Sequence, residues 1–546
     1  MSGGTLKQNR GGASRLFLAA FFIFWTALYA SIARGWLPNG DPAAYFLVAA
    51  SIVENRSLGM SEKSPVVPLE PGPDGKFYSK FGVGQSLLEA PFYAVGKALA
   101  PREAEPVHRF YFVYFVSVMS VPIISALGIV LFFLLALELG YGVKASAVCA
   151  FLLGLATMMM PYARFGFSEP LQACMITGCA LFAARARGRE GVGAWAAASA
   201  GAFIGAAALA KSANLLYVPI FALYLLFSAG PRRAGFMRAA AFCASASVFA
   251  AVILFLNDIR FGSPFALGYG AGRDAAFGFN VSALSGLYGL LFSPGKSVFL
   301  YAPILLASVA AAGAFHRERR AESFLVWAAS AAAFLLYSRW WAWHGDWAWG
   351  PRLIVPVVPL MALPLLPLVR GFSALRPAAK TSLAALAALS FFIQILGSTV
   401  NFHEYILQTR MLEPRWMKEI PERAGMRDEM LALHFAPDFS PVAGHWWLLK
   451  HAALDRGLPA DELRERMLKD FPWRGLMAYA PPLQPERAAG FDYWWLHFPR
   501  FFPASAGWSR PLFALLVSIA SAAFVLSIFA LSRKRKPSAP EAAPDE

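Results

Sequence analysis

The sequence has few charged residues and few cysteines. Asp, Glu, Lys and Arg make up 15% of its 546 residues, whereas hydrophobic residues make up 58%. Soluble globular proteins contain about 25% charged residues, so this composition excludes a soluble multidomain protein and an intrinsically disordered chain. The four cysteines lie in apolar stretches and form no CxxC pair, which excludes a disulfide framework and the common cysteine-based metal sites. The composition predicts an integral membrane protein.

Apolar runs near 20 residues in length recur along the chain, and each can cross about 30 Å of hydrocarbon as an α-helix. We therefore expect an all-α, polytopic membrane fold with about twelve transmembrane helices. No internal repeat divides the chain into two similar halves. The predicted spans lie near residues 15–33, 109–138, 143–160, 169–184, 193–210, 213–229, 239–257, 298–315, 322–338, 353–369, 381–399 and 510–532.

Positively charged residues gather in alternate short loops between these spans and at both ends of the chain. By the positive-inside rule these segments are cytoplasmic, so both termini lie inside and the number of spans is even. The basic residues spread over one membrane face and form no groove. The net charge of +16 therefore does not indicate a nucleic-acid partner. These residues are Lys7, Arg10, Arg15, Arg185, Arg187, Arg189, Arg232, Arg233, Arg238, Arg317, Arg319, Arg320, Arg370, Arg376, Lys380, Arg533, Lys534, Arg535 and Lys536.

The first span has two interpretations. A basic start followed by an apolar run also describes a secretory signal peptide. The run over residues 16–33 is longer than the usual apolar core of a signal peptide, about 7–15 residues, so we interpret it as an uncleaved anchor.

The longer loops lie on the opposite, outer face, and they divide the chain into regions. Residues 34–108 form the first outer loop, in which two short apolar segments, 43–53 and 84–99, predict helices along the membrane interface. The large outer region also contains a soluble-looking helix at 459–470. The expected regions are 1–400, mainly transmembrane; 401–509, a mixed outer insertion without an assigned role; 510–536, the last transmembrane helix with its basic end; and 537–546, a disordered tail.

The first outer loop opens with Asn39-Gly40-Asp41-Pro42, directly after the first span. Asp is a favoured N-cap and Pro suits the first helical position, so the segment predicts a helix capped by Asp41. A capping box is absent because Ala44 stands at N3. An acidic group that a helix start holds in a fixed position also suits catalysis, and the two interpretations are compatible.

A basic and aromatic segment follows in the same loop. The run Lys76-Phe-Tyr-Ser-Lys-Phe-Gly-Val-Gly-Gln85 places Lys80 near the expected membrane interface. One interpretation of Lys80 is a lysine that snorkels its ammonium group towards the lipid headgroups. The other is a lysine that binds a lipid phosphate.

These features resemble the GT-C superfamily of integral membrane glycosyltransferases, which use polyprenyl-phosphate sugars. The acidic residue after the first span, the two interface helices and the Tyr78–Gln85 segment carry the resemblance. It covers about residues 15 to 400, and it is closest to the bacterial relatives of protein O-mannosyltransferases (glycosyltransferase family 39) and of the lipid A aminoarabinose transferase. Gly82-Val83 departs from the pattern, since relatives often have two prolines there. Further matches are Tyr162–Pro170, Ala210–Ser212, Leu287–Gly295 and Trp349–Arg352.

The resemblance implies an enzyme with an outer active site, which in a bacterial inner membrane faces the periplasm. Asp41 would be the general base that takes the proton from the acceptor hydroxyl. Phosphate is a good leaving group, so one base suffices, whereas a glycosidase needs a carboxyl pair. Direct displacement would invert the anomeric centre. The candidates for binding the donor phosphate are Lys80, Arg352, Lys211 and Arg339.

Glu169 is a second outer carboxylate, in the matching position before the fourth span. It could hold a divalent cation together with Asp41, or orient the acceptor. The other interpretation is that Glu169 interacts favourably with the positive end of the helix dipole, since Ser168-Glu169-Pro170 opens that span. The sequence itself assigns no metal or cofactor.

A cluster of tryptophans occupies Trp340–Trp349. Most of them are typical of the aromatic belt at a membrane interface, and one or two could stack on a sugar or on the isoprenoid chain of a donor. His344 and Asp346 lie on the side of the membrane where the chemistry is expected. The candidates for substrate contact are Tyr78, Gln85, Arg164, His344, Asp346 and Trp349.

Three other functions stay open. A secondary transporter or lipid flippase suits about twelve helices, although the missing repeat and the outer placement of charge disfavour it. A polysaccharide ligase or polymerase would share the donor lipid and differ in its acceptor. A non-catalytic subunit would present the large outer region to a partner. The sugar, the acceptor (a lipid, a glycan or a protein) and the prenyl chain length are not encoded in any pattern that we can interpret.

Overall fold

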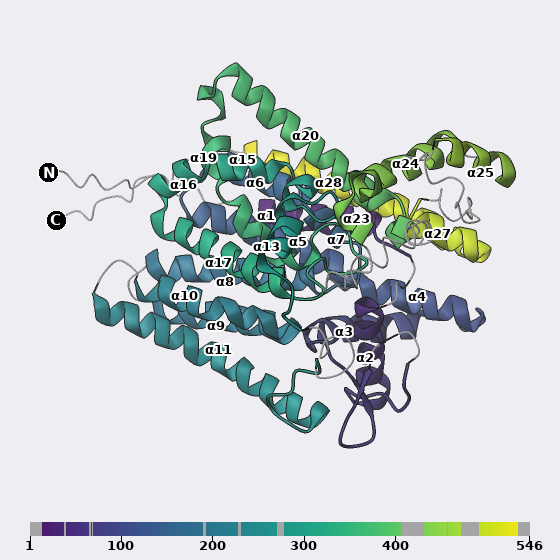
Figure 1. Cartoon of the computed structure of the whole chain (residues 1–546), viewed down its shortest axis with the longest axis horizontal. Coiled ribbons are helices and arrows are strands. Elements are labelled where there is room, and N and C mark those ends of the chain that lie inside the picture. The colour runs from purple at the N-terminus through teal and green to yellow at the C-terminus, as the bar shows by residue number, and fades with distance from the viewer. Residues whose placement is uncertain are drawn as a thin grey trace, which may run out of the picture.

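The computed structural model describes a mostly helical bundle whose long helices run roughly parallel to one another (Figure 1). The sheet in the described part of the chain is an antiparallel hairpin of β1 (Leu69–Pro71) and β2 (Phe77–Ser79). The predicted disordered tail lies outside the described residues. These are residues 14–35, 37, 40–64, 67, 69–188, 193–227, 231–269, 278–403, 405–406, 431–455, 457–470 and 491–532.

Within the described residues, six helical stretches are long and apolar enough to cross a membrane, which agrees with a multi-pass membrane protein. The predicted number of about twelve spans stays a prediction, because the other apolar helices are shorter. The six stretches are α4 (Pro106–Val118) with α5 (Ser120–Glu138), α9 (Gly193–Ala210), α11 (Arg232–Phe261), α17 (Arg320–Arg339), α20 (Pro377–Thr399), and α28 (Ala506–Ser532) with the turn η6 (Pro503–Ser505). The shorter apolar helices are α1 (Arg15–Ser31), α6 (Val143–Leu155), η1 (Ser212–Leu216) with α10 (Tyr217–Leu226), α13 (Ala283–Phe292), and η2 (Arg352–Val357) with α18 (Val358–Ala362).

The predicted spans at 298–315 and 353–369 are each divided into several short helices. Proline has no backbone N–H and clashes with the preceding helical turn, so proline-containing apolar runs break into short helices. The run at 298–315 becomes α14 (Val298–Tyr301), α15 (Ile304–Ala310) and α16 (Ala312–Glu318), and the run at 353–369 becomes η2, α18 and α19 (Leu365–Arg370). The helices α7 (Met159–Tyr162) and α8 (Glu169–Gly188) complete the central part of the bundle.

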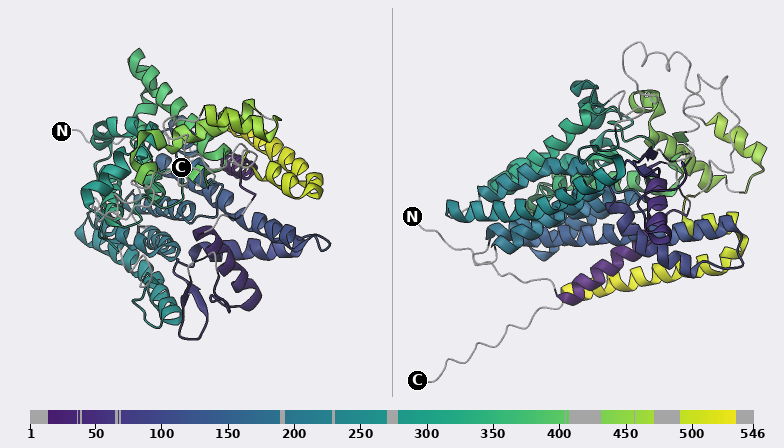
Figure 2. Two further views of the ribbon diagram at one scale, coloured as in Figure 1. Left: turned by 45° about the vertical axis from the view of Figure 1, so that its right-hand side comes forward. Right: turned by 90° about the horizontal axis from the view of Figure 1, so that it is seen from below.

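The two ends of the described chain lie at the same end of the bundle. Helices α1 and α28 pack side by side and antiparallel (Figure 2), with the rings of Phe24 and Phe524 5.4 Å apart. At the opposite end lie α2 (Asp41–Asn55), α3 (Gly84–Leu99), α23 (Leu431–Phe435), α24 (Pro441–Leu454), α25 (Ala460–Lys469) and α27 (Trp494–Phe501) (Figure 1). The helices predicted at 43–53, 84–99 and 459–470 are thus present as α2, α3 and α25. Their placement relative to the membrane stays a prediction.

Helix α9 is built from small residues and packs between α8 and α11. A Cβ atom at Gly201 would collide with the carbonyl oxygen of Phe242 on α11. Small residues allow helix backbones to approach closely in a membrane protein. The glycine therefore sets the distance between α9 and α11.

We expect Gly201→Leu to destabilise the protein by about 1–3 kcal/mol, because the added side chain forces α9 and α11 apart. The measurement is thermal unfolding in detergent. Ala194→Leu is the matched control, since Ala194 lies on the exposed face of the same helix. Equal melting temperatures for the two variants would contradict this view of the α9–α11 contact.

A buried ionic network ties the C-terminal part of the chain to the N-terminal part. Arg34, just after α1, forms an ion pair with Asp492 (Nε–Oδ2 2.9 Å) and donates to Asn401 Oδ1 at 2.6 Å. Arg164, between α7 and α8, donates to the backbone oxygens of Ile32 and Asp492. Both arginines and Asp492 are almost completely buried. The segment around residue 492 is therefore part of the same packed unit as the bundle.

Candidate functional site

Asp41 is the first residue of α2. The residue before it, Gly40, has φ +85°, a conformation that glycine adopts without strain. The prediction that Asp41 caps the helix is wrong: Gly40 occupies the N-cap position and no side chain caps α2. Instead, Asp41 Oδ2 accepts a hydrogen bond from Arg352 Nη1 at 2.7 Å. In this bond both the donor and the acceptor are charged, so Arg352 fixes the position of this carboxylate.

Arg352 lies between two carboxylates. It opens η2 directly after the turn at Gly350, which has φ +62°. Its Nε atom is 3.7 Å from Glu169 Oε1, and Lys211 Nζ is 4.0 Å from the same oxygen. Glu169 is buried, and its Oε2 atom has no hydrogen-bond partner among the described residues. Four predicted site residues from distant parts of the sequence thus form one cluster.

A chain of neutral polar groups supports this cluster from behind. Tyr45, one turn after Asp41 on α2, donates its hydroxyl proton to Ser168 Oγ (3.1 Å), which also accepts from Gln172 Nε2 (3.0 Å). Asn214 Nδ2 in turn donates to Gln172 Oε1 at 2.9 Å. The sequence analysis missed these residues. The spacing of Ser168 and Gln172, one helical turn apart and beside Glu169, is the signal that could have identified them.

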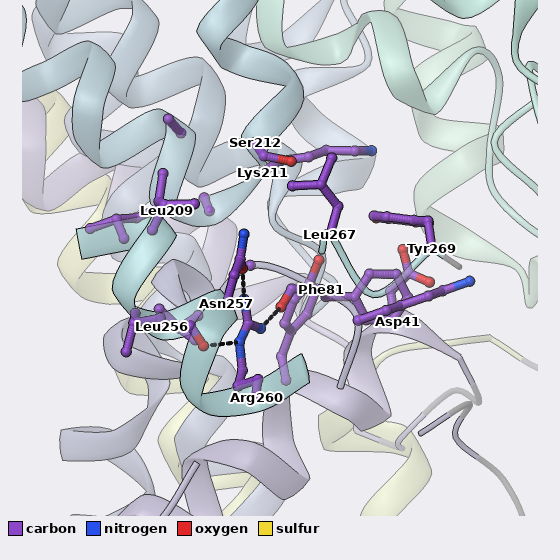
Figure 3. A pocket seen from close by; sticks show the side chains of 17 residues that line it. Asp41, Phe81, Leu209, Lys211, Ser212, Leu256, Asn257, Arg260, Leu267 and Tyr269 are labelled. Carbon is purple, nitrogen blue, oxygen red and sulfur yellow. Dashed lines mark hydrogen bonds between the residues drawn. The ribbon is translucent and has the colours of Figure 1, made fainter. Parts of the chain in front are cut away.

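A cavity that is open to solvent lies next to the cluster. Its wall combines charged groups with apolar helix faces: Leu209 of α9 and Leu256 of α11 lie on the side opposite to Asp41 (Figure 3). Burial lowers the pKa of Lys211, while Glu169 and Asp41 oppose this effect. The polar lining residues include Asp41, Tyr45, Lys80, Lys211, Ser212, Asn257, Arg260 and Tyr269.

The tryptophan-rich segment approaches Arg352 from the other side. Gly345 and Asp346 both have positive φ, +71° and +59°, and a Cβ atom at Gly345 would lie 2.8 Å from Arg352 Cβ. His344 Nδ1 accepts a hydrogen bond from the Asp346 backbone N–H at 3.0 Å. Burial raises the pKa of Asp346, and the nearby charge of Arg352 opposes this. Asp346 therefore faces the same guanidinium as Asp41.

Lys296 holds this turn in place, and the sequence analysis did not identify it. The residue is buried, and its Nζ atom donates to the carbonyl oxygens of Asp346 (3.1 Å) and Ala348 (2.8 Å). No sequence signal separates Lys296 from other lysines, because its partners are backbone atoms about fifty residues away.

Five other predicted residues belong neither to the charged cluster around Arg352 nor to the lining of the cavity. Tyr78 is buried and donates its hydroxyl proton to Asp74 Oδ2 across the hairpin turn. Gln85 donates to Glu89, and Arg164 belongs to the network of Asp492 described above. Arg339 is exposed and donates to the carbonyl of Phe279. Trp349 is buried, with its ring against Tyr301 and His445.

Glu89 is a buried carboxyl group on α3, close to the start of α2. Its partner is Gln85, whose Nε2 donates to Oε1 at 2.8 Å. A Cβ atom at Gly166 would lie 3.5 Å from Glu89 Oε1 and 3.4 Å from Pro42 Cβ, so Glu89 sits behind the helix start that carries Asp41. Burial raises the pKa of Glu89 to about 8.

This pKa makes the stability of the protein depend on pH. The folded protein holds the Glu89 proton up to about pH 8, whereas the unfolded chain releases it near its ordinary pKa. Between these values the folded state binds more protons, so stability falls as pH rises, by up to about 1.4 kcal/mol per pH unit. We expect Glu89→Gln to remove this dependence. Melting curves from pH 5 to pH 8 test it, and parallel curves for wild type and variant would contradict it.

The described residues contain no group of three or more His, Cys, Asp or Glu side chains that could hold a metal ion. The carboxylates of Asp41 and Glu169 are bridged by the guanidinium of Arg352. This donor set does not fit a divalent cation between them, because a cationic side chain takes its place. The mechanism below therefore includes no metal.

Comparison of this chain with known proteins finds matches among solved structures. No family model matches the chain, and no curated protein matches it. The archaeal oligosaccharyltransferase AglB from Archaeoglobus fulgidus, in complex with an inhibitory peptide and a dolichol-phosphate, is 15% identical, with a TM-score of 0.48. The match covers 76% of this chain and 59% of the AglB chain, so the chain spans about three fifths of that protein.

ArnT from Cupriavidus metallidurans, bound to undecaprenyl phosphate, is 14% identical, with a TM-score of 0.45. That match covers 87% of this chain and 76% of ArnT. The chain is structurally similar to both. At this low sequence identity the similarity concerns the backbone arrangement alone.

Proposed function

We propose that this chain is a GT-C-like glycosyltransferase, which moves a sugar from a polyprenyl-phosphate donor to a hydroxyl group of an acceptor. The observation that supports the proposal is the cavity in which Asp41 meets the ammonium groups of Lys80 and Lys211 beside apolar helix faces. The proposed reaction requires a base for the acceptor hydroxyl, cations for the donor phosphate and an apolar wall for the isoprenoid chain.

In this mechanism Asp41 removes the proton from the acceptor hydroxyl. The acceptor oxygen forms a bond to the anomeric carbon on the face opposite to the phosphate. The bond between that carbon and the phosphate oxygen breaks, and its electron pair leaves with the polyprenyl phosphate. The configuration at the anomeric carbon is inverted. Asp41 Oδ2 is bound by Arg352, and Oδ1 makes no hydrogen bond among the described residues, so Oδ1 is the oxygen that takes the proton.

The cations serve two different purposes in the proposal. Lys80 and Lys211 line the cavity, where they would bind the donor phosphate and stabilise the charge that develops on it as the bond breaks. Arg352 is already committed to Asp41 and Glu169, so it acts mainly as the group that orients the base. The negative charge of Glu169 then offsets the positive charges of Arg352 and Lys211.

The cellular setting follows from the same proposal. The site lies at the end of the bundle opposite to the start of α1 and the end of α28 (Figure 2). With those ends in the bacterial cytoplasm, as the positive-inside rule predicts, the cavity opens on the periplasmic side of the inner membrane. A described part of the region 401–509, the helix α23, packs beside the site, since the His434 ring lies 4.4 Å from the His344 ring. A role for this region in acceptor choice is part of the proposal.

A donor panel tests this function. The purified protein in detergent is mixed with radiolabelled undecaprenyl-phosphate sugars and with lipid, glycan and peptide acceptors. We expect consumption of one donor, release of undecaprenyl phosphate and an inverted anomeric product. Absence of both turnover and undecaprenyl phosphate binding would contradict the proposal.

A further inference from the structure

Arg260 lies at the C-terminal end of α11, at the edge of the cavity, and no motif in the sequence points to it. Its side chain is only 7% exposed. In the described part of the chain no carboxylate lies within ion-pair distance of its guanidinium. A buried cation without a carboxylate is costly unless other polar groups surround it. Its hydrogen bonds therefore indicate what it does.

The guanidinium holds the backbone on both sides of Lys80. Its Nη1 atom donates to the carbonyl oxygen of Phe81 at 2.9 Å and to that of Ser79 at 3.3 Å. The segment after α11 packs on the same residue: a Cβ atom at Gly268, which has φ +71°, would lie 2.9 Å from Lys80 Cα. The peptide groups that flank Lys80 are thus fixed to the end of a long helix.

The other donors of Arg260 point into the protein. Its Nε atom donates to the carbonyl of Leu256 at 3.2 Å, and Nη2 donates to Asn257 Oδ1 at 2.8 Å (Figure 3). Asn257 is itself fixed, because its Nδ2 atom donates to the carbonyl of Pro264 at 3.1 Å. All three nitrogens of the guanidinium are bound to protein oxygens, so Arg260 is oriented for binding the backbone at the edge of the cavity.

We propose that Arg260 is a positioning residue for Lys80: it clamps the peptide groups on both sides of this lysine and so aims the ammonium group at the donor phosphate. The proposal rests on the proposed function, in which Lys80 binds that phosphate. Arg260 acts through Lys80, and it does not contact the phosphate.

A double-mutant cycle on undecaprenyl phosphate binding tests this inference without any need for turnover. We expect Lys80→Met and Arg260→Met each to weaken binding about 10-fold or more, because the first removes the charge-assisted contact to the phosphate and the second leaves Lys80 without the clamp that aims it. The double variant should bind no worse than Lys80→Met alone, since the effect of Arg260 passes through Lys80. Arg233→Met is the matched control, on the exposed, opposite end of the same helix about 40 Å away.

Two further variants keep the test independent of folding. Arg260→Lys retains the charge and one set of donors, so it should recover part of the affinity. Asn257→Ala loosens the guanidinium without removing it, so it should weaken binding less than Arg260→Met. Melting temperatures in detergent identify any variant that is misfolded.

The outcomes separate the two proposals. Additive losses in the double variant would mean that Arg260 acts on the phosphate independently, and they would overturn the inference. Unchanged binding in folded Arg260→Met, with a loss in Lys80→Met, would also overturn it and leave the proposed function standing. Wild type that binds no undecaprenyl phosphate would refute the proposed function, and this inference with it.

Discussion

Asp41→Asn is expected to lower the rate of sugar transfer about 100- to 10,000-fold while undecaprenyl phosphate still binds. The range is that of a lost general base. Asparagine has the shape of aspartate, and its amide oxygen can still accept the hydrogen bond from Arg352, so the cluster keeps its geometry. What the variant lacks is a group that takes the proton from the acceptor hydroxyl. The measurement is the single-turnover rate with saturating donor.

Asp258→Asn is the control for this experiment. Asp258 is an exposed carboxylate near the C-terminal end of α11, and it does not line the cavity. We expect wild-type rates from it. A folded Asp41→Asn protein that transfers sugar at the wild-type rate would show that another group is the base, and the mechanism would have to be abandoned.

Arg352→Met should destabilise the protein by about 3–5 kcal/mol and also abolish transfer. Removal of one partner from a buried ion pair leaves the other charge uncompensated, and that is the typical cost. Here one guanidinium serves two carboxylates, Asp41 and Glu169, of which Glu169 is buried. The fall in melting temperature in detergent measures the effect on stability, and undecaprenyl-phosphate sugar turnover measures the effect on activity.

Two further variants test this prediction: a substitution in an exposed ion pair, and a second substitution that removes one of the unpaired charges. Arg370 pairs with Glu318 at 2.5 Å, but half of its side chain is exposed. Arg370→Met should therefore cost less than about 1 kcal/mol. Adding Glu169→Gln to Arg352→Met should restore part of the lost stability, since it removes the more deeply buried of the two unpaired charges. Equal losses for Arg352→Met and Arg370→Met would contradict the picture of a buried charge cluster.

Local patterns in the sequence were sufficient to predict most helices and several of the clustered residues. A run of apolar residues is visible in the sequence itself, and it predicts a helix whatever the rest of the chain does. Asp41, Glu169, Lys211 and Arg352 stood out because each is a charge beside an apolar run, at the end where the chain leaves the membrane. The structure brings these four together, although their chemical roles remain predictions.

The rest depends on contacts between distant parts of the chain. Arg339 and Arg352 look alike in sequence, but one is exposed and bonded to a loop carbonyl while the other lies between two carboxylates. Arg260 and Lys296 bind backbone carbonyls 179 and 50 residues away, and any residue type offers a carbonyl. No pattern of side chains can reveal such a contact, so neither residue was predicted.

The ion pair between Arg34 and Asp492 limits the order in which parts of the protein can pack together during synthesis. The two residues are 458 positions apart, and at a synthesis rate of about 5–20 residues per second the ribosome needs roughly 20–90 s to travel that distance. During this time the ion pair between Arg34 and Asp492 cannot form, nor can the hydrogen bond from Arg164 to the backbone of Asp492. The outer end of the bundle can therefore close only when synthesis is nearly complete. A nascent chain that stalls before residue 492 therefore lacks the contacts that join the C-terminal part of the chain to Arg34 and Arg164.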